Sequence, residues 1–159
     1  MRVRAFGIGI IVAAACAAPA TAGAAIVVGQ SIDGVRLGAT EAQVLSVLGA
    51  PGYKMGEGAS TSWGYPTTLE GRVGFAASHD VSGMWTGSKR QKTDKGIGPG
   101  SSLAKTRKVY PKVKCTVGPF GPRSAICALR TRFAGRRVET LFVFYTRTSP
   151  MREVDIGFS

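Results

Sequence analysis

The stretch that decides the fold is VRLGATEAQVLSVL at residues 35–48, which is matched by IGPGSSLAKTRKVY at residues 97–110. The two stretches align at a constant offset of 62 positions, so that Gly38 corresponds to Gly100 and Thr40 to Ser102. Repetition at such a spacing is typical of one supersecondary unit that occurs twice in a chain. The sequence therefore predicts a first unit over residues 25–88, a basic connector over residues 89–96 and a second unit over residues 97–159.

Each stretch predicts a short helix. Thr40 is a favourable N-cap residue, and Gln43 stands three positions later, which is the spacing of a capping box. Apolar residues then recur at helical spacing over residues 42–48, and a Gly-Ala-Pro-Gly run ends the helix. In the second stretch Ser102 takes the capping position, but Lys105 replaces the glutamine. The second helix is therefore expected to begin with a weaker cap.

Alternating apolar and polar residues after each helix predict antiparallel strands. In the first unit we expect three strands, over residues 61–65, 72–77 and 81–86. In the second unit we expect four, over residues 113–116, 125–133, 137–146 and 153–158, with a hairpin turn at Ala134-Gly135. The predicted fold class is α+β, with two tandem repeats that each pack a short helical segment on an antiparallel β-sheet.

The strand expected over residues 137–146 carries apolar residues on both of its faces. This pattern indicates that one face lies under a helix and that the other is at least partly covered, by the first unit or by a ligand. The two sets are Val138, Thr140, Phe142 and Phe144 on one face, and Glu139, Leu141, Val143 and Tyr145 on the other.

Residues 1–24 are predicted to be a signal peptide. Arg2 and Arg4 supply the positive start, an apolar stretch follows, and Ala-Thr-Ala at residues 20–22 forms a small-residue cleavage site. An uncleaved anchor and lipidation at Cys16 are alternatives that the composition of this segment disfavours. We therefore expect a secreted protein with no transmembrane segment in the mature chain.

Once the signal peptide is removed, the chain retains two cysteines, Cys115 and Cys127. An even pair in an oxidising compartment predicts one disulfide. With His79 as the one histidine, far from both cysteines in the sequence, there are too few soft ligands for a closed zinc site. No metal and no cofactor are expected.

The charge of the chain is unevenly distributed. Residues 23–88 hold three basic and five acidic residues, whereas residues 89–159 hold sixteen basic and four acidic ones. Such an asymmetry favours anionic partners, including wall polymers, acidic membrane surfaces and acidic proteins. Nucleic acid is not expected as a partner, because export removes the usual target and no nucleic-acid-binding signature is visible.

The run GATEAQVL at residues 38–45, followed by LGAP at residues 48–51, resembles the repeat of the secreted β-lactamase inhibitor protein family and of the SmpA/OmlA-type lipoproteins of outer-membrane assembly. The resemblance implies a Gly-x-Thr turn that opens a short helix on an antiparallel sheet. In the inhibitor each of two tandem units carries a disulfide soon after its helix. Cys115 and Cys127 lie in the matching place here, and the first unit has no cysteine.

An enzymatic function finds little support in the sequence. His79 and Asp80 are adjacent, and neighbouring side chains on a strand or loop generally diverge rather than form a catalytic pair. Glycoside cleavage would need a pair of carboxylates, but Glu70 and Asp80 lie near predicted turns, so we expect both to be solvated. The Gly-rich run at residues 96–100 lacks the Lys-Ser/Thr ending of a phosphate-binding loop, and a turn before a capped helix explains it better. We therefore expect no catalytic residues.

Aromatic and arginine residues are the candidate binding residues. Large aromatics either fill a core or, when they face solvent from a sheet, anchor an interface. Arginine can bind carboxylate or phosphate through two parallel hydrogen bonds, or can protect a sheet edge from aggregation. The candidates are Trp63, Tyr65, Trp85, Tyr145, Arg130, Arg132, Arg137 and Arg147.

These observations favour a secreted, non-enzymatic binding protein that recognises a protein partner through a sheet face, with a basic contribution from the second unit. The resemblance makes a hydrolase one such partner. The alternative is an envelope-associated structural factor that binds anionic wall or membrane polymers through its basic second half.

Overall fold

The computed structural model describes residues 25–57, 61–118 and 120–159. Its main element is an eight-stranded antiparallel sheet with the strand order β4-β5-β6-β7-β11-β10-β9-β8. Two short helices and a small three-stranded sheet accompany it, so the α+β class is confirmed. The predicted signal peptide lies outside the described residues.

The chain runs twice through a helix and four antiparallel strands. The first series is α1 (Glu41–Leu48), β4 (Tyr53–Met55), β5 (Thr61–Tyr65), β6 (Gly71–Phe75) and β7 (Val81–Thr86). The second is α2 (Leu103–Val109), β8 (Lys114–Val117), β9 (Ala125–Phe133), β10 (Arg136–Phe144) and β11 (Glu153–Phe158). The last strands of the two series, β7 and β11, pair antiparallel and join both into one sheet.

Local chemistry explains why both helices begin where they do. The Thr40 hydroxyl accepts a hydrogen bond from the Gln43 amide at 3.3 Å, and the Gln43 side chain accepts one from the Thr40 amide at 2.9 Å. The predicted capping box is therefore confirmed. At α2 the Ser102 hydroxyl accepts a hydrogen bond from the Lys105 amide at 3.2 Å, with no reciprocal side-chain bond.

Two parts of the fold differ from the sequence-based expectation. The first series contains a fourth strand, β4, which is three residues long at the sheet edge and too short to show an alternating pattern. A small sheet of β1 (Ile26–Val27), β2 (Ser31–Ile32) and β3 (Val35–Arg36) was also not predicted. Its strands are two residues each, so burial of Ile26, Ile32 and Val35 stabilises them rather than strand propensity.

Helix α1 buries less of its apolar side than the sequence spacing predicts, and the connector is partly buried. In α1 only Val44 is buried, and Leu45 and Val47 are more than two-fifths exposed. In the connector Gln91 and Thr93 are buried, and the Ile26 amide donates to the Lys92 carbonyl oxygen. The basic connector is thus packed against the fold, because β1 meets it through a bridge between Ile26 and Thr93.

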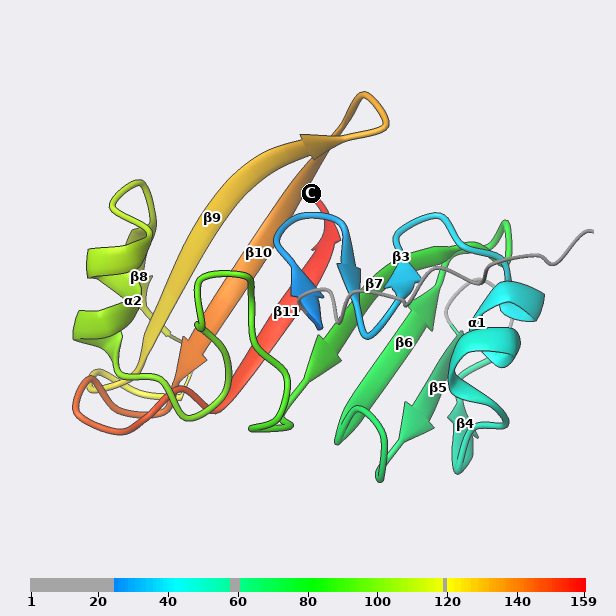
Figure 1. The fold of residues 1–159 in the computed structure, drawn as a ribbon, viewed down its shortest axis with the longest axis horizontal. Coiled ribbons are helices and arrows are strands. Elements are labelled where there is room, and N and C mark those ends of the chain that lie inside the picture. The colour runs from blue at the N-terminus through cyan, green and yellow to red at the C-terminus, as the bar shows by residue number, and fades with distance from the viewer. Residues whose placement is uncertain (1–24, 58–60, 119) are drawn as a thin grey trace, which may run out of the picture.

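The core lies on one face of the large sheet. Figure 1 shows β1–β3 and both helices on the viewer's side of this sheet. Trp63 of β5, Phe142 of β10 and Ile156 of β11 are at most 1% exposed and belong to one continuous cluster that spans both strand series. The side chains that alternate with them project to the opposite side, which we call the open face.

The predicted disulfide is confirmed. Cys115 of β8 and Cys127 of β9 are register partners on the core side, and their sulfurs are bonded. The bond closes a loop of twelve positions at the edge of the sheet. A loop of this size corresponds to about 3 kcal/mol of stabilisation in the chain-entropy model.

Candidate functional site

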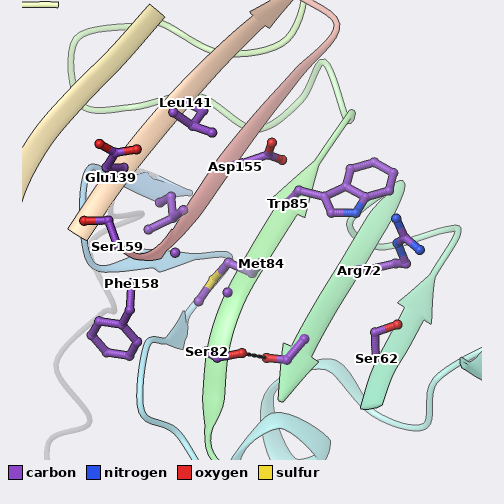
Figure 2. Close-up of a pocket in the computed structure, with 14 residues that line it drawn as sticks. Ser62, Arg72, Ser82, Met84, Trp85, Glu139, Leu141, Asp155, Phe158 and Ser159 are labelled. Carbon is purple, nitrogen blue, oxygen red and sulfur yellow. Dashed lines mark hydrogen bonds between the residues drawn. The ribbon is translucent and has the colours of Figure 1, made fainter. Parts of the chain in front are cut away.

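The open face carries a row of four side chains at its centre. Arg72 of β6, Trp85 of β7, Asp155 of β11 and Leu141 of β10 are successive register partners, so all four project to the same side. The Arg72 guanidinium lies 5.4 Å from the centre of the Trp85 ring. Figure 2 shows this row crossing the sheet, with Arg72 and Trp85 from the first series of strands and Asp155 and Leu141 from the second.

A second row, one step along the strands, consists of glycines. Gly74, Gly83 and Gly157 are successive register partners on β6, β7 and β11. A Cβ atom added at any of them would come no closer than 3.4 Å to another group, which is ordinary van der Waals contact. At Gly71, in contrast, a Cβ would lie 2.0 Å from the Trp85 carbonyl oxygen. Backbone packing thus requires Gly71 but does not require the three aligned glycines.

The two rows form a groove of about 500 Å³, which we call the central groove. Its floor at the three glycines is bare backbone, and Trp85 and Leu141 supply apolar walls. Ser62 and Glu139 also line it (Figure 2). A concave surface with apolar walls and a few polar groups is typical of a binding site.

Asp155 is the residue in the groove with the most perturbed chemistry. Burial raises its pKa to about 7; the nearby Glu153 adds to the rise, and Arg72 opposes it. Burial also raises the pKa of Glu153, against the effect of Arg152 and Arg72. Among the described residues no basic group forms an ion pair with Asp155. A carboxyl group in this condition can donate or accept a hydrogen bond near neutral pH.

The four candidate aromatic residues divide between the two faces of the sheet. Trp63 and Tyr65 are 1% and 2% exposed on the core side, where the Tyr65 hydroxyl donates to the Gly49 carbonyl oxygen at 3.3 Å. Trp85 is half-buried in the central groove, and Tyr145 is 42% exposed. Only Trp85 and Tyr145 can therefore meet a partner without unfolding.

Tyr145 lies in an aromatic and basic setting. Its ring centre is 4.6 Å from that of Phe120, which is also exposed, and the Arg152 guanidinium lies 5.4 Å from it. A hollow next to the central groove is lined by both Tyr145 and Trp85. The sequence-predicted aromatics on this side are thus parts of one continuous surface.

Three of the four candidate arginines also lie on the open face. Arg130, Arg132 and Arg137 alternate with core residues on β9 and β10, and all three are exposed. The Arg130 Nε atom donates to a Glu139 carboxylate oxygen at 2.5 Å. Arg147 lies in the loop after β10, where its amide donates to the Arg123 carbonyl oxygen, and its side chain is exposed.

The residues considered for catalysis do not come together. His79 is an exposed turn residue whose Nδ1 atom lies 2.9 Å from a Glu41 carboxylate oxygen. Glu70 accepts a hydrogen bond from the Ser88 hydroxyl at 3.0 Å, and Asp80 forms an isolated bridge with Thr40. The Gly-rich run at residues 96–100 is a turn, in which Lys105 donates to the Gly96 carbonyl oxygen.

Sequence reasoning missed Arg72, Asp155 and the three glycines, and it placed Leu141 on a partly covered strand face without naming it as a site residue. Gly83 and Trp85 are two positions apart in the strand expected over residues 81–86, so alternation alone puts both on one face. The pairing of β7 with β11, however, cannot be predicted from a local pattern.

Within residues 25–57, 61–118 and 120–159, no group of three or more His, Cys, Asp or Glu side chains could hold a metal ion. No helix in these ranges is long and apolar enough to cross a membrane.

Comparisons with protein-family models, with curated proteins and with solved structures found no match to this chain.

Proposed function

We propose that this chain is a secreted, non-enzymatic binding protein that recognises a protein partner through the open face of its large sheet. The observation that carries the proposal is the row of Arg72, Trp85, Asp155 and Leu141 beside three glycines that backbone packing does not require. A bare floor flanked by an aromatic ring gives room for a protruding segment of another protein. Trp and Arg are also the residue types that most often dominate interface energies.

The course of the chain supports a duplicated origin for this surface. Each series is a capped helix followed by four antiparallel strands, and the two series meet at their last strands. We propose that they are tandem repeats, as the 62-position offset indicates. The resemblance to the inhibitor family then makes a hydrolase the first partner class to test. The disulfide supports an oxidising, extracytoplasmic location.

Retention of a partner from an envelope fraction tests this function. Immobilised wild-type protein is compared with the double variant Trp85→Ala/Gly83→Leu, which removes the aromatic wall and fills the floor. The matched control is His79→Ala, an exposed residue that does not line the groove. We expect a specific protein to be retained by the wild type and the control at about 0.05 M and about 1 M salt, and to be lost from the double variant.

The alternative function, binding of anionic wall or membrane polymers, has one specific observation in its favour. Among the described basic residues after position 88, Arg130 alone forms an ion pair with a carboxylate. Polymer binding through this charge would vanish at high salt and would be indifferent to the groove variant. That outcome would replace the protein-binding proposal. Hydrolytic turnover that is lost in His79→Ala or Asp155→Asn would overturn the non-enzymatic assignment.

A further inference from the structure

The hairpin of β9 and β10 places two arginines directly opposite each other. Arg132 and Arg137 are register partners, and both side chains are exposed on the open face. Like charges in directly opposite positions of an antiparallel pair destabilise it. The two opposed arginines therefore lower the stability of the hairpin rather than contribute to it.

Neither of these two arginines forms an ion pair with a carboxylate in the described part of the chain. Arg130, two positions from Arg132 on the same face, is held by Glu139. The Arg136 guanidinium lies 3.5 Å from the centre of the Phe158 ring. No described carboxylate lies within 4.0 Å of Arg132 or Arg137. Two of the four hairpin arginines thus have a partner, and the opposed pair has none of this kind.

Protection of a sheet edge explains only one of the two arginines. Strand β8 pairs with residues 125–128 of β9, so Arg132 lies beyond it on an uncovered edge, where a positive charge discourages aggregation. Arg137 does not lie on an edge. Its strand pairs with β9 on one side, and on the other its carbonyl oxygen accepts a hydrogen bond from the Ser159 amide at 3.2 Å.

The arginine pair borders a hollow that continues from the central groove. The hollow has a volume of about 700 Å³, and it is lined by Arg130, Thr131, Arg132, Arg137, Glu139 and Ser159. Glu139 also lines the central groove. A partner seated in the groove therefore has direct access to the two arginines.

We propose that Arg132 and Arg137 bind a carboxylate side chain, an aspartate or a glutamate, of the protein partner that occupies the central groove. This inference rests on the proposed function. The planar guanidinium group matches a carboxylate through two parallel hydrogen bonds, and a bound anion between the two arginines removes their mutual repulsion. The contact of Arg130 with Glu139 shows the same chemistry within the chain, two positions away.

The test uses the arginine Nε–Hε signals in ¹⁵N NMR spectra of the full mature chain. The probe is the peptide acetyl-Ala-Glu-Glu-Ala-amide, and the control peptide has Gln in place of Glu. The test variant is Arg132→Gln/Arg137→Gln. Its charge-matched control is Arg107→Gln/Lys108→Gln, at two exposed positions of α2. We expect the acidic peptide to shift the signals of Arg132 and Arg137, and the test variant to bind it about tenfold more weakly.

Three outcomes decide against the proposal. If both double variants bind the acidic peptide equally weakly, the net charge of the chain alone accounts for the binding. Stronger binding of inorganic phosphate than of the acidic peptide would assign the site to a phosphate group instead. A lower melting temperature in Arg132→Gln/Arg137→Gln would indicate a structural role, since relief of repulsion predicts an unchanged or slightly higher one. Each of these results leaves the Trp85→Ala/Gly83→Leu retention experiment unaffected, so the two proposals fail separately.

Discussion

The raised pKa of Asp155 follows from the surroundings of this residue in the folded protein. It lies between Trp85 and Leu141 in the middle of the sheet, and no cation pairs with it among the described residues. The folded protein therefore holds a proton on this carboxyl group up to about pH 7, whereas an unfolded aspartate releases it near pH 4. A residue that destabilises the folded state above neutral pH, in the centre of an open groove, is more consistent with binding than with folding.

A pH-dependent loss of stability follows from this shift. Between about pH 4 and pH 7 the folded state binds more protons at Asp155 than the unfolded state, so the free energy of unfolding falls as the pH rises. Asp155→Asn should therefore be more stable than the wild type at pH 8 and similar to it at pH 4. Urea unfolding across this range measures the difference. A smaller slope remains in the variant, because the pKa of Glu153 is also raised.

The matched control for this prediction is Glu57→Gln, which changes an exposed carboxylate outside the central groove. It should keep the wild-type dependence on pH. Equal slopes for Asp155→Asn and the wild type would show that the Asp155 carboxyl is not perturbed in the folded protein.

At the scale of elements, the two helix starts differ in a way that the sequence already indicates. Gln43 and Lys105 occupy the same position, three residues after the N-cap and 62 residues apart. Only Gln43 returns a side-chain hydrogen bond to the cap amide. The capping motif therefore has both of its hydrogen bonds at α1 and one of them at α2.

This difference predicts unequal effects of one substitution at two equivalent positions. Gln43→Ala removes the 2.9 Å bond to the Thr40 amide and should lower the free energy of unfolding by about 0.5–1 kcal/mol. Lys105→Ala removes no capping bond, because the Ser102 hydroxyl contacts the backbone of residue 105. It removes only the exposed 3.4 Å hydrogen bond from Lys105 to the Gly96 carbonyl oxygen and should be close to neutral. Chemical denaturation of both variants measures the contrast. Equal effects would mean that the reciprocal bond contributes nothing.

At the scale of the whole molecule, the pairing of β7 with β11 makes one body of two strand series. Trp63, Phe142 and Ile156 belong to one buried cluster that crosses this pairing. Each series alone is short for a stable core, since small domains bury a lower fraction of their surface. The central groove also exists only because of this pairing, as Arg72 and Trp85 come from one series and Asp155 and Leu141 from the other.

A single unfolding transition is the consequence. Trp63 and Trp85 are the two tryptophans of the chain and lie in the first series, so fluorescence reports on that half. Ile156→Ala in β11, at a side chain that is 1% exposed, should destabilise the protein by about 2–5 kcal/mol. The midpoints from tryptophan fluorescence and from far-ultraviolet circular dichroism should fall together. A fluorescence midpoint that stays in place would show that the halves unfold independently.

The sequence by itself determined the features that depend on neighbouring residues. The capping box at Thr40, the bounds of β5, β7, β9 and β11, and the disulfide between Cys115 and Cys127 all agree with the local pattern. These features follow from hydrogen bonds and side-chain alternation within a few positions, so a short window contains the information. Strand β4 and the strands β1–β3 were missed, because two or three residues are too few to show a period.

Only the tertiary structure decided which side of the sheet is buried and which residues meet on the open face. Trp63 and Trp85 both lie in expected strands and the sequence pattern does not distinguish them. In the structure Trp63 is in the core, whereas Trp85 lines the central groove. Arg72 and Asp155 join the same row although 83 positions separate them in the chain. The physical reason is that strand register is set by burial summed over the whole sheet, and a one-residue shift would exchange the two faces.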